Sequence, residues 1–270
     1  MAFFRARLGR WLAAYLANPR DRALSVATSS ASRLAATLRK GDVLLVEGTS
    51  RFATAIRYLT QSTWSHAALY VGDATPPHAA SDTGHLFVEA DVSEGVRVMP
   101  LQFYADMHTR ICRPVGLSEA QIEAVVGYAM ERLGHQYDLK NIFDLARYLV
   151  PTPPVPQRWR RRMISFGSGD PTRAICSSLI ASAFQSVNYP ILPEVEYQRS
   201  MDSWRGYSEQ EIFHIRHHTL FTPRDFDVSP YFQIVKPTLA NGFDPASIPW
   251  AQPSAEALST TDPKTSDVAA

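Results

Sequence analysis

The sequence contains little cysteine and has no excess of either charge. Only two of its 270 residues are cysteine, Cys112 and Cys176, which is too few for a disulfide-based scaffold. Their spacing does not require a disulfide bond, so a reducing compartment is the simpler expectation. The 27 lysines and arginines balance the 26 acidic residues, and we therefore expect no nucleic-acid partner.

Long apolar runs, internal repeats and a glycine-rich phosphate-binding loop are also missing. No apolar run approaches the ~20 residues of a membrane-spanning helix. His214, His217 and His218 lie close together in the sequence, and we expect the first and last to share an exposed helix face. No cysteine or acid completes a metal-ligand set at a recognised spacing, so we predict neither a metal site nor a cofactor.

The N-terminus has an uncommon pattern. Residues 3–16 carry apolar side chains at helical spacing, with Arg5, Arg7 and Arg10 between them. This is typical of a basic amphipathic helix on an anionic membrane surface. The alternatives are a helix that packs on the domain and a signal peptide, although the apolar run Trp11–Ala17 barely reaches signal length. We therefore expect a cytoplasmic protein, with peripheral membrane association left open and export not expected.

The residue pattern predicts three regions: an N-terminal helix and linker (1–39), a domain (40–239) and a disordered tail (240–270) rich in Pro, Ser, Thr and Ala. Predicted strands are Val43–Glu47, Ala67–Val71, Leu86–Ala90, Val96–Met99, Arg110–Val115 and Phe232–Val235. Predicted helices are Arg51–Thr60, a segment capped by Ser118 and Gln121 and ending at Gly134, Asn141–Leu149, and one beginning near Cys176. Between Tyr189 and Phe232 the apolar residues show little clear helical or strand periodicity. Strands mixed with helices, without regular βαβ alternation, indicate an α+β fold.

Cys176 stands where a helix is predicted to begin, because Leu179, Ile180 and Ala183 form an apolar face just after it. The positive end of a helix dipole and unpaired N–H groups favour a thiolate at such a position. A nucleophilic cysteine needs that environment. The alternative is an inert buried cysteine, which is the role we expect for Cys112.

Two residues are candidates to activate this thiol. His66 begins an apolar strand, where it can be held by a sheet and still face a cleft, although a lone histidine there is more often structural. Glu89 lies in the middle of an apolar strand, where a carboxylate is costly unless it is paired. If strands 86–90 and 96–99 form a hairpin beside the His66 strand, Glu89 can orient the imidazole as the third member of a triad.

Five short motifs extend this interpretation. They are Gly41–Leu45, Ser65–Gly72, Phe87–Ala90 followed by Gly95-Val96, Gly134–Asp138, and Cys176–Leu179. Through them, residues 40–236 resemble the circularly permuted NlpC-type papain-like cysteine hydrolases, the YiiX/YebB-like group related to lecithin:retinol acyltransferase-like proteins. The resemblance implies an antiparallel sheet packed against helices. It also implies Cys176 as nucleophile, His66 as base and Glu89 as the residue that orients it, in the reverse of the usual papain order.

The resemblance also directs attention to residues around the triad. Tyr137 lies in the fourth motif, where packing in the core is the favoured role. Trp64 either lines a substrate groove or closes the core, and Asp42 is expected to stabilise its turn rather than touch substrate. Ser177 follows the nucleophile and is expected to contribute a backbone N–H group to oxyanion binding. Ser178 departs from the family, in which an acidic residue is frequent at that position.

The expected chemistry is attack of the Cys176 thiolate on an amide, ester or thioester carbonyl, giving a thioester acyl-enzyme that is hydrolysed or transferred. A lipid or lipidated substrate at a membrane surface suits the N-terminal pattern. A cell-wall peptide is the alternative substrate, and a catalytically silent scaffold at the membrane is the alternative of another class.

Overall fold

The structure, a computed structural model, describes residues 27–73, 84–91, 94–135, 175–202 and 206–249. The predicted helices at 3–16 and 141–149, as well as Tyr137, lie outside these residues.

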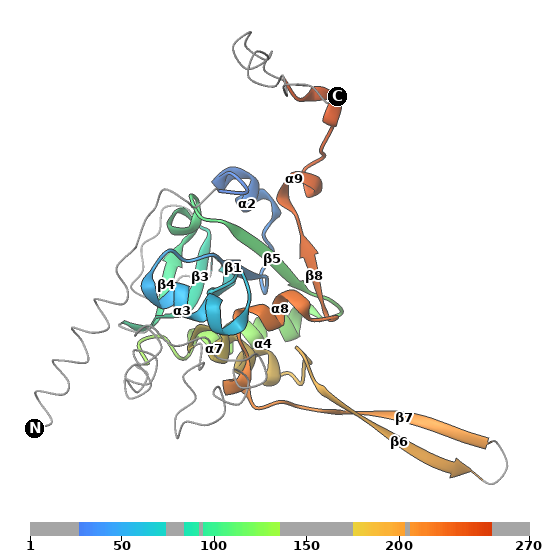
Figure 1. Cartoon of the computed structure of the whole chain (residues 1–270). Coiled ribbons are helices and arrows are strands. Elements are labelled where there is room, and N and C mark those ends of the chain that lie inside the picture. Colours follow the sequence, from blue (N-terminus) through green and yellow to red (C-terminus); the bar gives the residue numbers. More distant parts are fainter. Residues whose placement is uncertain (1–26, 74–83, 92–93, 136–174, 203–205, 250–270) are drawn as a thin grey trace, which may run out of the picture.

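Six antiparallel strands form the central sheet, in the order β4-β3-β2-β1-β5-β8 (Figure 1). Their bounds are β1 Val43–Val46, β2 His66–Gly72, β3 Leu86–Asp91, β4 Gly95–Pro100, β5 Thr109–Pro114 and β8 Phe232–Val235. All six predicted strands are therefore confirmed, and every predicted end lies within one residue of the observed one. The hairpin that the site prediction required is present, since β3 and β4 pair from Leu86–Pro100 to Asp91–Gly95.

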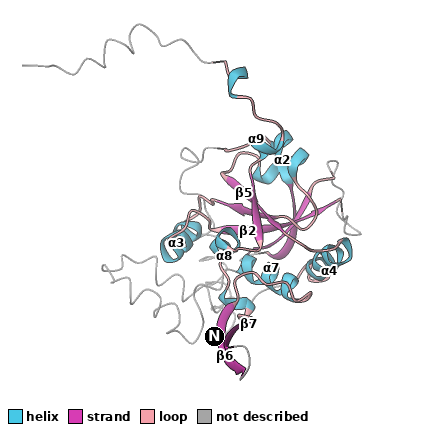
Figure 2. Ribbon diagram, turned by 90° about the vertical axis from the view of Figure 1, so that its right-hand side faces the viewer, coloured by secondary structure: helices cyan, strands magenta, loops and turns pink. Residues whose placement is uncertain are grey.

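Helices cover both faces of this sheet (Figure 2). The α-helices are α2 Ala31–Thr37, α3 Arg51–Thr60, α4 Glu119–Met130, α7 Ile175–Gln185, α8 Pro223–Val228 and α9 Pro237–Ala240, with short 3-10 turns η2 Leu101–Tyr104, η3 His218–Leu220 and η4 Pro245–Ser247. The predicted capping box of α4 is present, because the Gln121 N–H donates to Ser118 Oγ and the Ser118 N–H donates to Gln121 Oε1. Within the described part of the chain, no helix has the length and apolar character to span a membrane.

Two separate cores lie on the two faces of the sheet, because side chains alternate along each strand. In β1, Val43 and Leu45 join a core shared with α4, α7 and α8. Leu44 and Val46 join a second core shared with α2 and η2. All four β1 residues are buried. Packing on both faces therefore fixes β1, the strand that pairs with the start of β2.

The segment after Tyr189 departs from the prediction. It contains a two-stranded hairpin, β6 Glu194–Asp202 and β7 Gly206–His214, that projects from the body in Figure 1. His214 ends β7, whereas His218 begins η3. The prediction that these two histidines share a helix face is therefore wrong. The sequence missed the hairpin because its strands mix polar and apolar residues without the clean alternation of a strand on a core.

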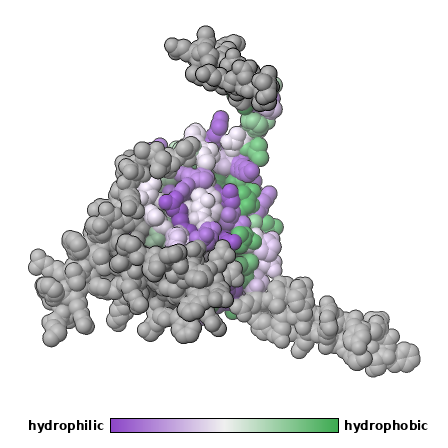
Figure 3. All heavy atoms as spheres, in the orientation of Figure 1, coloured by the Kyte–Doolittle hydropathy of each residue, from purple (hydrophilic) through white to green (hydrophobic). Residues whose placement is uncertain are grey.

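The predicted tail also begins too early. Helix α9 contacts α2, and Asn241 Nδ2 donates a hydrogen bond to Thr37 Oγ1 at 3.0 Å. Residues up to Asn241 are thus held against the domain by side-chain contacts that composition alone does not reveal. On this side the surface carries the exposed apolar residues Val228, Leu239 and Phe243, and Figure 3 shows hydrophobic residues gathered over β8 and α9.

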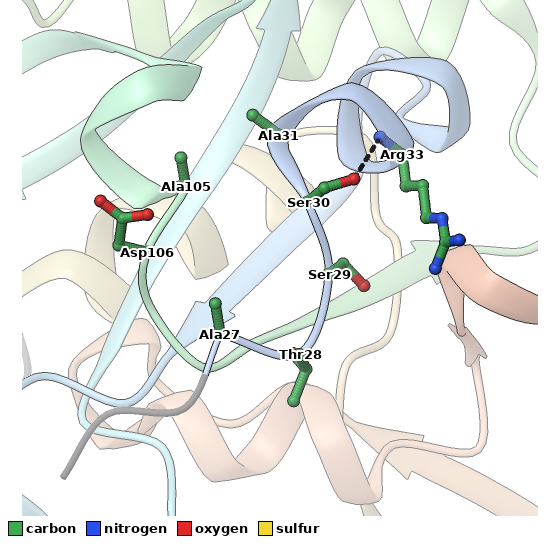
Figure 4. Close-up of a pocket in the computed structure, with 8 residues that line it drawn as sticks. All are labelled: Ala27, Thr28, Ser29, Ser30, Ala31, Arg33, Ala105 and Asp106. Atoms are coloured by element: carbon green, nitrogen blue, oxygen red, sulfur yellow. Dashed lines mark hydrogen bonds between the residues drawn. The ribbon is translucent and has the colours of Figure 1, made fainter. Parts of the chain in front are cut away.

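The first described residues enter beside η2. Thr28 Oγ1 donates to the Thr109 carbonyl oxygen at 3.2 Å, which ties the entering chain to β5. Figure 4 shows residues 27–31 lining a pocket with Ala105 and Asp106, just after η2. The Ser30 hydroxyl accepts the Arg33 N–H and so caps α2. The N-terminal segment is therefore attached at the η2 face of the sheet.

A buried ion pair secures the start of β1. Asp42 is 1 % exposed, and its two carboxylate oxygens accept hydrogen bonds from Arg113 at 2.8 and 2.7 Å. Arg113 also donates to the Thr37 carbonyl oxygen, and Asp42 accepts the Arg39 N–H at 2.8 Å. Burial raises the pKa of Asp42, although the hydrogen bonds from Arg113 act in the opposite direction.

We expect Arg113→Leu to lower the free energy of unfolding by about 3–5 kcal/mol, because it leaves the buried Asp42 carboxylate without its partner. Urea denaturation measures the change. Lys40→Gln is the control, since it breaks the exposed Lys40–Glu123 pair and should cost less than about 1 kcal/mol. Equal effects of the two substitutions would contradict a special role for the buried pair.

Candidate active site

Cys176 is the second residue of α7 and is 4 % exposed. Helix α7 packs against β2 and β3, which brings its N-terminal turn to the strand that carries His66. The N–H groups of the first turn of a helix have no partner within the helix. The fully buried Ser177 places its hydroxyl oxygen 3.9 Å from Cys176 Sγ. The thiol therefore lies among hydrogen-bond donors.

His66 is the first residue of β2, and its position is fixed by the residue before it. Ser65 Oγ accepts the Gly48 N–H at 2.8 Å, which ties the start of β2 to the end of β1. His66 Nε2 lies 2.6 Å from Glu89 Oε2. The negative charge of the nearby Cys176 acts together with that of Glu89 to raise the pKa of His66. The imidazole is therefore fixed by Glu89 and interacts with the candidate nucleophile.

Glu89 is buried, with a side chain only 2 % exposed. It lies on β3 directly across from Arg97 on β4. Arg97 donates to Glu89 Oε1 from Nε at 2.9 Å, and its Nη2 is 2.7 Å from the same oxygen. The Tyr104 hydroxyl, from η2, donates to Glu89 Oε2 at 2.5 Å. The carboxylate is therefore paired on both oxygens, which removes most of the penalty for burying it.

The electrostatics of the pair favour a thiolate and an imidazolium. Burial would lower the pKa of His66, but negative charge on Glu89 and on Cys176 outweighs it and raises that pKa well above its ordinary value. Burial would likewise raise the pKa of Cys176. The positive charge and hydrogen bond of His66 outweigh that effect, so the pKa of Cys176 is lowered. Each group thus stabilises the charged form of the other.

The pKa values of Glu89 and Tyr104 are shifted in directions that keep Glu89 ionised and Tyr104 protonated. Burial would raise the pKa of Glu89, but His66, Tyr104 and Arg97 lower it to about 2. Burial and the neighbouring Glu89 carboxylate raise the pKa of Tyr104 well above its ordinary value, which keeps the Tyr104 hydroxyl protonated and able to donate. Glu89 is therefore an anion throughout the physiological pH range.

Cys112 has the opposite environment. It lies on β5, is fully buried, and belongs to the core on the α7 face of the sheet. Burial raises its pKa. Both cysteines are free thiols in the structure. Only Cys176 therefore has surroundings that support nucleophilic attack.

Trp64 and Asp42, which the sequence also offered as site residues, have structural surroundings. Trp64 is 2 % exposed in the core, its indole N–H donates to Asp227 Oδ2 at 2.9 Å, and the Arg110 guanidinium lies 4.9 Å from its ring centroid. Of its two alternatives, Trp64 thus closes the core. Asp42 lies beyond the far end of β1 from the Val46–His66 pair and stabilises its turn. Tyr137 is outside the described residues.

Sequence reasoning missed three residues that hold the site: Ser65, Arg97 and Tyr104. Arg97 had a detectable signal, since a charged residue within an apolar strand opposite another charged residue suggests a cross-strand pair. Tyr104 follows the strand in a short turn, and nothing in its local sequence points to Glu89. Its contribution depends on how η2 folds back over the sheet.

Comparison with known proteins finds one family that part of the chain resembles. Residues 37–148 match the model of a family described as permuted papain-like amidase enzyme, YaeF/YiiX, C92 family. The matched segment includes His66, Glu89, Arg97 and Tyr104. Over this segment, which is less than half of the chain, the sequence is similar to the permuted papain-like amidases. The predicted α+β permuted papain-like fold is confirmed, and so is the class of enzyme, a cysteine hydrolase of amidase or peptidase type.

A solved structure, described as metalloprotein yiiX from Escherichia coli O157:H7 (DUF1105), is 18 % identical to this chain with a TM-score of 0.42. The similarity covers 73 % of this chain and 96 % of that one. No curated protein matches the sequence significantly. Among the described residues of this chain, no group of three or more His, Cys, Asp or Glu side chains is placed to hold a metal ion.

We expect Cys176 to react with iodoacetamide at pH 7 at least about tenfold faster than Cys112, because the thiolate is the reactive form. The single-cysteine variants Cys112→Ser and Cys176→Ser, followed by intact mass, give the two rates separately. His66→Gln should slow labelling of Cys176 by removing the cation that lowers its pKa. Equal rates for the two thiols would show that Cys176 is not activated.

Glu89 should also make the stability of the fold depend on pH. Its pKa is about 2 in the folded protein and about 4.3 in an unfolded chain. Its contribution, on the order of 3 kcal/mol, is therefore complete above pH ~4.3 and is lost as the pH falls towards 2. Urea denaturation of wild type and Glu89→Gln should show a difference in stability that shrinks over this interval. A difference that does not change with pH would mean that Glu89 is not a stabilised anion.

Proposed function

We propose that Cys176, His66 and Glu89 form a catalytic triad that hydrolyses an amide bond through a thioester acyl-enzyme. One observation carries the proposal: the His66 imidazole is hydrogen bonded to the buried Glu89 and interacts with Cys176, whose pKa it lowers. This arrangement matches the roles that define a triad, in which an acid orients the base and the base activates the nucleophile. The amidase class of the matching family favours an amide as the bond that is cleaved.

In acylation, the Cys176 thiolate attacks the carbonyl carbon and the electron pair of the C=O bond moves to oxygen. His66 then gives a proton to the leaving nitrogen as the C–N bond breaks. In deacylation, neutral His66 takes a proton from water as the water oxygen attacks the thioester. The C–S bond breaks, the acid is released, and the thiolate and imidazolium are restored.

The start of α7 supplies a place for the negative oxygen that develops in both steps. The backbone N–H groups of Cys176 and Ser177 lie in the first helical turn, where no intrahelical acceptor is available to them. Donors of this kind stabilise a tetrahedral intermediate, and losing one typically costs 10²–10³-fold in kcat.

We further propose that the substrate is a lipid or lipidated molecule at an anionic membrane surface. The arginines and apolar residues of segment 3–16 favour binding to such a surface. The described chain begins at residue 27, beside Ala105 and Asp106, immediately after the η2 turn that holds Tyr104. Residues 17–26 span at most about 35 Å when fully extended. A membrane-bound N-terminus would therefore keep the triad close to the bilayer.

The acyl-enzyme is the species that tests the triad. We expect an N-acyl amide presented in anionic vesicles to add its acyl mass to Cys176, as a thioester that hydroxylamine removes. Cys176→Ala should lose both the adduct and turnover while keeping the wild-type circular dichroism spectrum. Cys112→Ser is the matched control and should retain both. Turnover by Cys176→Ala would refute the proposed nucleophile, whereas rapid alkylation without any turnover would favour a scaffold or a different substrate class.

Membrane binding has its own test in the full-length chain. The variant Arg5→Glu/Arg7→Glu/Arg10→Glu should lose flotation with phosphatidylserine-containing vesicles, since juxtamembrane basic residues contribute about 1 kcal/mol each. The Cys176 alkylation rate in buffer should stay the same, because these residues are not part of the triad. Unchanged flotation would overturn the proposal of membrane attachment and leave the triad unaffected.

A further inference from the structure

The carboxylate of Glu89 is shared among more donors than the orientation of a histidine requires. Arg97 occupies Oε1 with two nitrogens, at 2.9 and 2.7 Å. Tyr104 donates to Oε2, the same oxygen that lies 2.6 Å from His66 Nε2. Tyr104 is fully buried and Glu89 is 1 % exposed, so water screens these interactions less than at the surface, although the Arg97 side chain is 24 % exposed.

Arg97 is itself held by three carboxylates and an aromatic ring. It lies on β4 directly opposite Glu89, and its Nη1 is 2.8 Å from Glu94 Oε2. Its Nη2 lies 3.6 Å from Asp91 Oδ2, and its guanidinium lies 5.9 Å from the ring centroid of Phe103. The result is a row of alternating charges that runs from the nucleophile to the surface: Cys176, His66, Glu89, Arg97 and Glu94.

An unshared Glu89 would create a difficulty for deacylation. In the acyl-enzyme Cys176 carries no charge, so Glu89 is the remaining anion against His66. A buried carboxylate paired only with the imidazole would favour the imidazolium strongly. His66 would then stay protonated at neutral pH and would be unable to take a proton from the attacking water.

We propose that Arg97 and Tyr104 are positioning residues that act through Glu89: they draw its negative charge away from His66 and so allow the imidazolium to release its proton during deacylation. Arg97 supplies a full positive charge and has the larger effect. Tyr104 supplies a neutral donor on the oxygen that faces His66, so it has a smaller effect in the same direction and also fixes the geometry of that oxygen. This inference rests on the proposed triad.

The groups that face the His66–Glu89 pair come from a helix, a strand and a 3-10 turn. Besides the pair itself, on β2 and β3, they are Cys176 and Ser177 from α7, Arg97 from β4 and Tyr104 from η2; the acids Asp91 and Glu94 contact Arg97. With Cys176 blocked, the charges near His66 are those of Glu89, Arg97 and the two acids on Arg97. A change in the pKa of His66 in the blocked protein therefore measures how far Arg97 and Tyr104 offset the negative charge of Glu89.

The experiment blocks Cys176 of the full-length protein with methyl methanethiosulfonate, which removes the thiolate as acylation does. The Hε1 resonance of His66, assigned by its loss in His66→Gln, is then followed by NMR against pH. We expect Arg97→Gln to raise the pKa of His66 by about one unit, because a cation next to Glu89 is lost. Tyr104→Phe, which preserves the ring, should raise it by a smaller amount.

Two control variants test whether the effect is specific. Tyr70→Phe removes another buried tyrosine hydroxyl, one that is hydrogen bonded to His85 at 2.7 Å, and should leave the pKa of His66 unchanged. Arg97→Lys keeps the charge and should restore most of the wild-type value. Circular dichroism establishes that each variant is folded. If Arg97→Gln does not fold, the inference is tested by comparing the pKa of His66 in Tyr104→Phe with that in Tyr70→Phe.

An unchanged pKa of His66 in the folded Arg97→Gln and Tyr104→Phe proteins would overturn this inference. So would a rise in Tyr70→Phe equal to that in Tyr104→Phe, because it would show a general response to a lost hydroxyl. Failure of the triad itself is seen separately, as wild-type Cys176 that labels no faster than Cys112. A rapidly labelled Cys176 with no shift in the variants would refute only the role of Arg97 and Tyr104.

Discussion

A single buried carboxylate organises this site. Glu89 lies within the sheet at 1 % exposure, and a charge there is tolerated only if each oxygen has strong partners. The structure provides them from three elements, with Arg97 on β4, Tyr104 in η2 and His66 at the start of β2. The packing of these elements and the ionisation of Glu89 therefore depend on one another, which couples the stability of the fold to the position of His66.

The antiparallel sheet and α7 contribute different parts of the chemistry. The sheet holds His66 and Glu89 rigidly, because both faces of its central strands are buried in separate cores. Helix α7 brings Cys176 at its first turn, where free N–H groups and the helix dipole favour negative charge. If the helix and sheet were separated, Cys176 would lose the interaction that lowers its pKa, and His66 would lose the part of its raised pKa that comes from Cys176.

Much of the fold was predictable because its signals are local. The six strands of the sheet, α3 and the capping box of α4 follow from short periodic runs and from Ser118 and Gln121. The hairpin β6–β7 and helix α8 were missed, since their sequences lack a sustained period. The tail was predicted to begin at residue 240, but the contact of Asn241 with Thr37 joins segments about two hundred residues apart, which composition cannot register.

By itself, the sequence predicted an α+β fold and made Cys176, His66 and Glu89 candidates, since a thiol at a helix start and a carboxylate in an apolar strand are unusual; the resemblance carried by the five motifs then implied their roles. Only the tertiary structure decided that the three meet, that Arg97 and Tyr104 share the carboxylate, and that Trp64 closes the core. Pairing of buried charges depends on distances of about 3 Å between distant segments, and the packing of helices on a sheet sets those distances.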